Sequence, residues 1–250
     1  QEKEHSMEHT GLEGKEIAIV AMGESQLDFH LSLIHSNKYD EVWAINAMAG
    51  IIKEVDRTFM LDPASRFLDT DDAGTQTGIM RKILPTHPGP IYTCELDDRV
   101  PGAVLYPLTE VVEATDCAYF NNTIPYAIAY AMYQKVKAIN LFGIDFTYKG
   151  NLHFAEEGKA CVEFWLSKCI SAGIDVKIAP RSSLLDTDKP LREKLYGYHR
   201  LDDPIVVGHS KGQGFKTMKV SQYEALQKEL QLKKVKETGV ILEVPEAKRY

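Results

Sequence analysis

Glycines and polar residues directly follow the apolar runs of this sequence. In chains that bind small molecules, turns are often located at such positions. They are Gly23, Glu24 and Ser25 after the first run, Asn46 and Asp62 after the next two, and Gly143 and Asp145 at the end of a later one. Glycine lets the backbone approach a ligand closely, a helix amino end attracts phosphate, and asparagine offers hydrogen bonds to a ribose or base. These residue types favour a nucleotide-binding function.

An ordinary structural interpretation of the same residues stays open. Ser25 would cap the following helix and Asn46 would occupy a turn. The first turn is not G-x-G-x-x-G, because Gly23 is its single glycine and no acidic residue ends a clean second strand. The missing motif disfavours NAD and FAD as ligands.

Two further polar groups could contact a phosphate or a metal. Asn122 and Thr123 precede an Ala-rich helix, so their side chains would lie beside a helix amino end, a setting that suits a phosphate or a sugar. The acidic run at 69–72 (DTDD) could hold Mg²⁺ or Mn²⁺ against a diphosphate. Aspartates are also common in polar turns, and we favour a turn without a metal site.

The elements that must position these residues alternate between strand and helix, as in α/β proteins. Strands are predicted at 16–22, 41–46, 58–62, 91–94, 103–106, 138–145, 175–180 and 240–244, and helices at 27–36, 49–55, 77–84, 124–134, 155–171 and 221–237. In an open parallel sheet the ligand lies beyond the carboxyl ends of the strands. We therefore expect a Rossmann-like α/β fold, a mostly parallel sheet flanked by helices, with a lid-like segment and a C-terminal helix.

Length and composition agree with a globular enzyme-sized domain. The 250 residues are 44% hydrophobic and 26% charged, enough to bury a core. We expect a flexible leader at 1–15, a nucleotide-binding and catalytic domain at 16–185, and a lid with a helix–strand appendage at 186–250. No apolar stretch approaches the ~20 residues of a membrane span, and no signal-like core is present, so we expect a cytoplasmic protein.

Charge is distributed unevenly along the chain. The net charge is −7, yet residues 211–250 carry nine Lys and Arg against five Asp and Glu. The helix at 221–237 is expected to be amphipathic, with Tyr223, Leu226, Leu230 and Val235 on one side. Its lysines could guide an anionic acceptor or form a contact between copies in a homo-oligomer. Nucleic acid is a minor alternative, because no aromatic residues interleave with the lysines.

Several segments together resemble a known enzyme family. The segments are IAIVAMGES at 17–25, AIN at 44–46, Asn122-Thr123, LFGIDF at 141–146 with a following His153, and APRSSLL at 179–185. In this order they resemble the bacterial sialyltransferases of glycosyltransferase family 42 and the related motility-accessory and pterin pyrophosphokinase-like proteins. The similarity spans residues 15–185, and its most specific part is the segment at 126–146 followed by a histidine.

The resemblance implies a domain that binds a nucleotide-activated sugar donor. In those sialyltransferases a histidine after the G-I-D-F strand is the general base on the acceptor hydroxyl, and lid tyrosines support the departing phosphate. His153 is the nearest match for the base, with His199 and His209 as alternatives. Tyr148 and Tyr198 match the tyrosines, and Tyr196 is a further candidate. The sequence departs from the family at 22–25, where the asparagine that is typical of the family is missing.

Three functions follow. The leading one is transfer of a sugar from a nucleotide-sugar donor, such as a CMP-sugar, to a glycan or other hydroxyl acceptor, which requires no metal cofactor. The second is a pterin pyrophosphokinase that uses ATP and Mg²⁺ and would employ Asp62 or the pair Asp69 and Asp71. The third is a nucleotide-binding module without catalysis.

Overall fold

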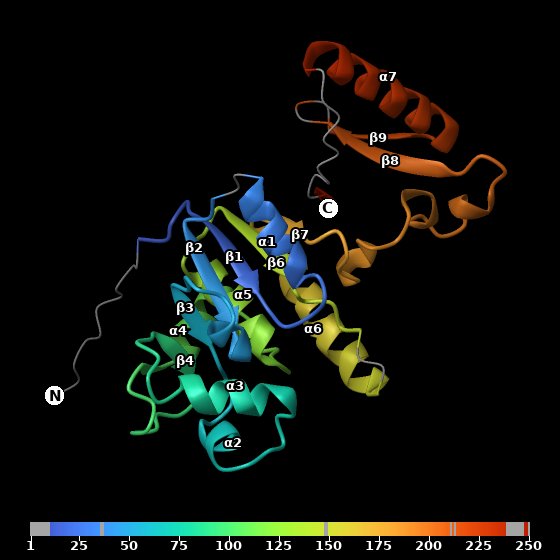
Figure 1. The fold of residues 1–250 in the computed structure, drawn as a ribbon. Helices are drawn as coiled ribbons and strands as arrows, with labels where there is room; N and C mark the ends of the chain where they lie inside the picture. The colour runs from blue at the N-terminus through green and yellow to red at the C-terminus, as the bar shows by residue number, and fades with distance from the viewer. Residues whose placement is uncertain are drawn as a thin grey trace.

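The apolar runs of the sequence form the strands of one eight-stranded sheet, shown in Figure 1. The computed structural model describes residues 11–35, 38–147, 150–210, 212, 214–238 and 248–249. The strand order is β10-β7-β6-β1-β2-β3-β4-β5. The strands are β1 (Glu16–Val20), β2 (Glu41–Ile45), β3 (Arg57–Phe59), β4 (Ile91–Thr93), β5 (Ala103–Leu105), β6 (Ala138–Phe142), β7 (Asp175–Ile178) and β10 (Lys248–Arg249).

Seven of these strands are parallel, and β10 pairs antiparallel with β7. β1 lies at the centre, between β6 and β2, and Val20 is in register with Phe142 and Ala44. The chain therefore reverses its direction of travel across the sheet at β1, which is where doubly wound sheets bind ligands. The expected mostly parallel, Rossmann-like sheet is confirmed.

Helices cover both faces of the sheet because its central strands are apolar on both sides. Ile17 and Ile19 of β1 belong to one core cluster, whereas Ala18 and Val20 belong to another. The first face packs against α4 (Leu108–Thr115), α5 (Thr123–Tyr133) and α6 (Leu152–Ser171), and the second against α1 (Gln26–Ile34), η1 (Asn46–Gly50), α2 (Ser65–Leu68) and α3 (Thr75–Ile83). This alternation is what period-2 strand geometry requires.

Local sequence signals fix where the longer helices begin and end. Asn122 caps α5 by accepting a hydrogen bond from the Ile124 amide, and Asn151 caps α6 by accepting one from the Phe154 amide. Each cap satisfies an amide that has no partner inside its helix. Gly173 follows α6 with a φ of +82°, the left-handed conformation that ends many helices.

The first face of the sheet buries Leu12 together with residues of β1 and α5. The Gly14 amide also donates to the Lys135 carbonyl oxygen at 3.1 Å. Residues 11–15 thus belong to the folded body, and their assignment to a flexible leader was wrong, because a lone leucine in a polar segment gives no periodic signal. The rest of that leader, 1–10, lies outside the described residues.

A second, two-stranded sheet follows the main body. β8 (Ile205–Ser210) pairs antiparallel with β9 (Gly214–Lys219), and α7 (Val220–Thr238) follows them. The lid expected within residues 186–250 is therefore followed by a hairpin that the sequence did not predict. Before it the chain forms three single-turn helices: η2 (Leu184–Asp186), η3 (Leu191–Glu193) and η4 (Tyr198–Arg200). The strand expected at 240–244 lies outside the described residues.

α7 does not have the apolar face expected for it. Leu226, Leu230 and Leu232 are all 45% exposed or more, so none of these leucines is buried. At 100° per residue, Leu232 projects from the side opposite Leu226 and Leu230. The amphipathic interpretation was therefore wrong.

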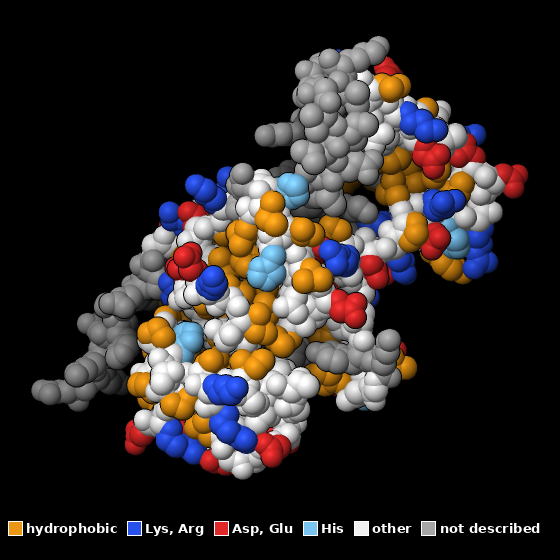
Figure 2. All heavy atoms as spheres, in the orientation of Figure 1, with side chains coloured by type: hydrophobic (Ala, Val, Ile, Leu, Met, Phe, Trp, Pro, Cys, Tyr) orange, Lys and Arg blue, Asp and Glu red, His pale blue; other side chains and the backbone are white. Residues whose placement is uncertain are grey.

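An apolar surface lies over α1 on the second face of the main sheet. α1 buries Phe29 and leaves Leu27, Leu31 and Ile34 exposed, and Figure 2 shows hydrophobic side chains gathered in this region. The helices of the described ranges include none with the length and apolar character needed to traverse a bilayer.

Candidate functional site

The ends of β1 and β6 meet at the carboxyl edge of the sheet. The Gly23 amide donates to the Gly143 carbonyl oxygen at 2.8 Å. A Cβ added at Gly143 would lie 2.0 Å from the Ala21 oxygen, and one at Gly23 would lie 2.5 Å from Asp145 Oδ2. Both glycines are thus required because the chain approaches itself here, which is an alternative to the close approach of a ligand. Their contact with a nucleotide stays a prediction.

A buried clasp joins Ser25 to the loop that follows β6. The Ser25 amide donates to Asp145 Oδ2 at 2.8 Å, the Ser25 hydroxyl donates to Asp145 Oδ1, and the Gly143 amide donates to Ser25 Oγ at 2.8 Å. The Ser25 side chain makes no capping bond to α1, so its expected role as a helix cap was wrong. Its hydroxyl instead links the segment that follows β1 to the segment that follows β6.

The electrostatic environment of the clasp shifts the pKa of its carboxyl group upward. Asp145 is 4% exposed, and its burial raises the pKa of the carboxyl above the ordinary value, against the effect of the two hydrogen bonds from Ser25. The negative charges of Asp28 and Glu24 raise the pKa further. Arg181, beyond β7, forms an ion pair with Asp28 at 2.9 Å. A phosphate near the amino end of α1 would therefore meet acidic groups as well as helix amides.

The loop after β6 is also held from the side of β7. The Ser182 hydroxyl donates to the Ile144 carbonyl oxygen and the Ser183 hydroxyl donates to the Asp145 carbonyl oxygen, both at 2.6 Å. Both serines belong to the segment at 179–185 that resembles the sialyltransferases, and no role was predicted for them. The serine pair directly after a strand is the signal that could have identified them, since short hydroxyl side chains commonly bond nearby backbone.

Asn46 lies at the carboxyl end of β2 in a strained conformation. Its φ is +48°, although it is not a glycine. Its Oδ1 atom is buried, and no group of the described chain hydrogen-bonds to it. A left-handed asparagine whose buried oxygen lacks a partner is the kind of departure that accompanies ligand sites.

Glu157 contacts both His153 and Asn121, which is the neighbour of Asn122 and its hydrogen-bond partner. Asn122 Nδ2 donates to Asn121 Oδ1 at 2.8 Å, and Asn121 Nδ2 donates to the Glu157 carbonyl oxygen at 3.0 Å. His153 Nε2 lies 2.9 Å from Glu157 Oε1. His153 is the second residue of α6, which begins three residues before the predicted helix, and its side chain is 83% exposed. The structure thus connects the base predicted from the family to the amino end of α5, where Thr123 is half-buried.

The remaining predicted residues have separate surroundings. Asp62 forms an ion pair with Arg66 at 2.7 Å. Glu24 is exposed on the turn before α1. Tyr198 is in η4 and 56% exposed, and Tyr148 lies outside the described residues. Tyr196 and His199 line a hollow of about 510 Å³ whose other lining residues carry charges of both signs: Lys189, Arg192 and Lys194, with Asp186 and Glu193.

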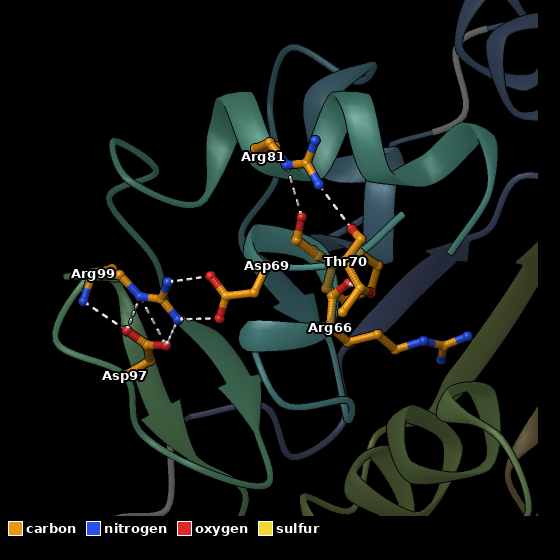
Figure 3. A network of polar contacts seen from close by, with 7 residues as sticks. Arg66, Asp69, Thr70, Arg81, Asp97 and Arg99 are labelled. Carbon is orange, nitrogen blue, oxygen red and sulfur yellow. Dashed lines mark hydrogen bonds and ion pairs between the residues drawn. The ribbon is translucent and has the colours of Figure 1, made fainter. Parts of the chain in front are cut away.

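The acidic run at 69–72 is held by arginines, as Figure 3 shows. Arg99 donates to both oxygens of Asp69, at 2.7 and 3.1 Å, and also binds Asp97. Arg81 donates to Asp71 Oδ1 at 2.9 Å. These ion pairs agree with a structural turn. Within the described ranges no group of three or more His, Cys, Asp or Glu side chains is arranged to hold a metal ion.

Comparison with known proteins gives similarity of structure alone. No protein-family model and no curated protein matches the chain. Structures of the sialyltransferase CstII from Campylobacter jejuni are similar to it. The complex with the substrate analogue CMP-3FNeuAc has 20% identity and a TM-score of 0.43, over 67% of this chain and 82% of that one. The complex with cytidine-5'-monophosphate has 20% identity and a TM-score of 0.42, over 68% and 83%.

Proposed function

We propose that the protein is a glycosyltransferase that moves a sugar from a nucleotide-activated donor, such as a CMP-sugar, to the hydroxyl of a glycan or other acceptor. The observation that carries this proposal is Asn46, with its strained backbone and unpartnered buried oxygen at the end of β2, beside the central strand. Ligands of doubly wound sheets bind at this edge. The family resemblance of the sequence supplies the choice of a nucleotide-sugar.

Three helices begin at the carboxyl edge of the sheet, and the amino ends of two of them would bind the phosphate of the nucleotide. α1, α5 and α6 all begin at the carboxyl edge, since each follows or precedes a parallel strand of the sheet. Helix amino ends present free amides and a partial positive charge to a phosphate. Because Asp28 and Glu24 lie at α1, we assign the phosphate to the α5 and α6 ends, near Asn122 and His153.

The chemistry requires one proton acceptor and stabilisation of one leaving group. The acceptor oxygen forms a bond to the anomeric carbon while the bond from that carbon to the phosphate oxygen breaks, and the electron pair leaves with the nucleotide. When Nε2–H of His153 donates to Glu157, Nδ1 is free to accept the hydroxyl proton. Tyr148 and Tyr198 hydroxyls would donate to the leaving phosphate.

The test begins with ligand binding. We expect CMP to raise the thermal unfolding midpoint with or without Mg²⁺, and UDP, GDP, ADP and ATP to raise it less, because only a ligand of the folded state stabilises it. Stabilisation by ATP that depends on Mg²⁺ would instead indicate the pyrophosphokinase.

Replacing His153 by Ala then separates an enzyme from a binding module. We expect the variant to bind CMP as the wild type does and to lose roughly 100-fold or more in transfer rate, the usual contribution of a general base. His35→Ala, at the exposed end of α1, is the matched control and should retain full activity. Equal rates in the two variants would exclude His153 as the base.

A further inference from the structure

Three side-chain oxygens near the carboxyl edge of β2 are buried without hydrogen bonds. They are Asn46 Oδ1, Gln76 Oε1 and Thr77 Oγ1, and no partner for any of them exists among the described residues. Thr77 is 3% exposed, so water does not replace the missing partner freely. Each buried polar group without a partner destabilises the fold. Such a cost concentrated in one region calls for an explanation.

The three oxygens belong to neighbouring elements. Asn46 begins η1, and α3, which carries Gln76 and Thr77 in its first turn, packs against η1. Ala47, next to Asn46, lies in one core cluster with Met80, which is one turn from Thr77 on the same side of α3. Figure 1 shows α3 beside the end of β2. Because α3 leads back toward the parallel strand β4, its amino end lies at the carboxyl edge.

The chemistry of these atoms selects the kind of group that would fill the region. Amide oxygens only accept hydrogen bonds, and a threonine hydroxyl both donates and accepts. A phosphate offers acceptors alone and would leave the amide oxygens unsatisfied. The nearby cations are already engaged, since Arg66 pairs with Asp62 and Arg81 with Asp71, so they do not attract an anion into this region. A sugar carries several hydroxyl groups, each of which can donate a hydrogen bond to an oxygen of this kind.

We propose that Asn46, Gln76 and Thr77 bind the hydroxyl groups of the donor's sugar and so select the sugar rather than the nucleotide. This inference rests on the proposed function for the source of the sugar. The inference adds two residues to the proposed site, Gln76 and Thr77, which the pattern of polar residues after apolar runs does not identify. The nucleotide end of the donor then extends toward Asn122 and His153.

The test compares Thr77→Val with Thr75→Val, which alters an exposed threonine of the same helical turn. Thr77→Val should raise the unfolding midpoint of the free protein, because it removes an unpaired buried hydroxyl and keeps the shape. By calorimetry it should bind CMP unchanged and bind CMP-N-acetylneuraminate about tenfold more weakly, the loss expected for one hydrogen bond. A lower midpoint, or equal effects on both ligands, would overturn the inference.

A second measurement distinguishes failure of this inference from failure of the proposed function. Saturation-transfer NMR would use free N-acetylneuraminate and N-acetylglucosamine as probes of the wild type, Thr77→Val and Gln76→Leu. If no nucleotide binds, the proposed function fails. The sugar site still stands if a free sugar gives a signal that both variants lose and Thr75→Val retains. Absence of any sugar signal in the wild type rejects the sugar site.

Discussion

Asp145 shows how one buried carboxyl can serve the architecture of a site. Its oxygens accept both hydrogen bonds offered by Ser25, and burial raises its pKa above the ordinary value of about 3.9. A carboxyl with a raised folded-state pKa stabilises the fold fully below the unfolded-state value, and that contribution is lost as pH rises through the folded-state value. Burial of the Asp145 carboxyl therefore costs the fold least in acid, although the hydrogen bonds from Ser25 themselves favour the ionised carboxylate.

The pH dependence can be measured by comparison with Asp145→Asn. We expect the wild type to lose stability relative to the variant as pH rises from about 4 upward, so that its free energy of unfolding falls against that of the variant. The reason is that only the wild type must ionise a buried carboxyl. Urea unfolding at several pH values gives both quantities. A difference that is constant with pH would show that Asp145 ionises in the fold as easily as in water.

At the scale of elements, the join between β1 and β6 depends on a glycine. Gly143 has a φ of +68°, and an added Cβ would lie 2.0 Å from the Ala21 oxygen. Gly143→Ala should lower the free energy of unfolding by at least about 2 kcal/mol, because left-handed backbone alone costs about 1–2 kcal/mol for other residues.

Gly78→Ala is the matched control for this prediction. Gly78 lies inside α3, and nothing is within 4 Å of an added Cβ. Alanine there should raise the free energy of unfolding by roughly 0.5–1 kcal/mol, because it reduces the backbone freedom lost on folding. Chemical denaturation of both variants checks the pair, and a tolerated alanine at 143 would show that the two strand ends can separate.

The elements that sequence patterns predicted best are those whose burial is complete. β1 and β6 are apolar at four of their five positions, and α5 begins and ends within one residue of the predicted helix. α2, α4 and the β8–β9 hairpin were missed. α4 contains β-branched valines and threonines that weaken a helical pattern, and β9 is mostly exposed, so it has no apolar alternation to detect.

The candidate site was predictable only where a residue type carries its own signal. Asn46 was identified because a polar residue ends an apolar run. The clasp was not, because Ser25 and Asp145 are 120 residues apart in the sequence. The lack of partners at Gln76 and Thr77 depends on the packing of α3 against η1, which no local pattern encodes. Whether the predicted residues contact a nucleotide stays a prediction.

At the scale of the whole molecule, stability should be unevenly distributed. The central strands are buried on both faces, whereas residues 221–233 of α7, apart from the half-buried Tyr223, and most of β9 are exposed. Local opening is easiest where few apolar contacts are buried. In hydrogen exchange followed by mass spectrometry, amides of β1 and β6 should exchange orders of magnitude more slowly than those of β9 and α7. Equal protection would mean that the hairpin and α7 unfold together with the main sheet.

The position of β1 at the centre of the sheet also has a kinetic consequence. From β1 to β5 each strand pairs with the next one in the chain. This half of the sheet can therefore assemble one strand at a time, by closing short loops. β6 must return across the whole of this half to reach β1. Closing so long a loop is slow, because its entropy is lost before the new contacts form. The carboxyl edge of the sheet, which would bind the donor, is therefore completed late in folding. It forms when β6 pairs with β1 and brings the chain segments before and after β6 onto one surface.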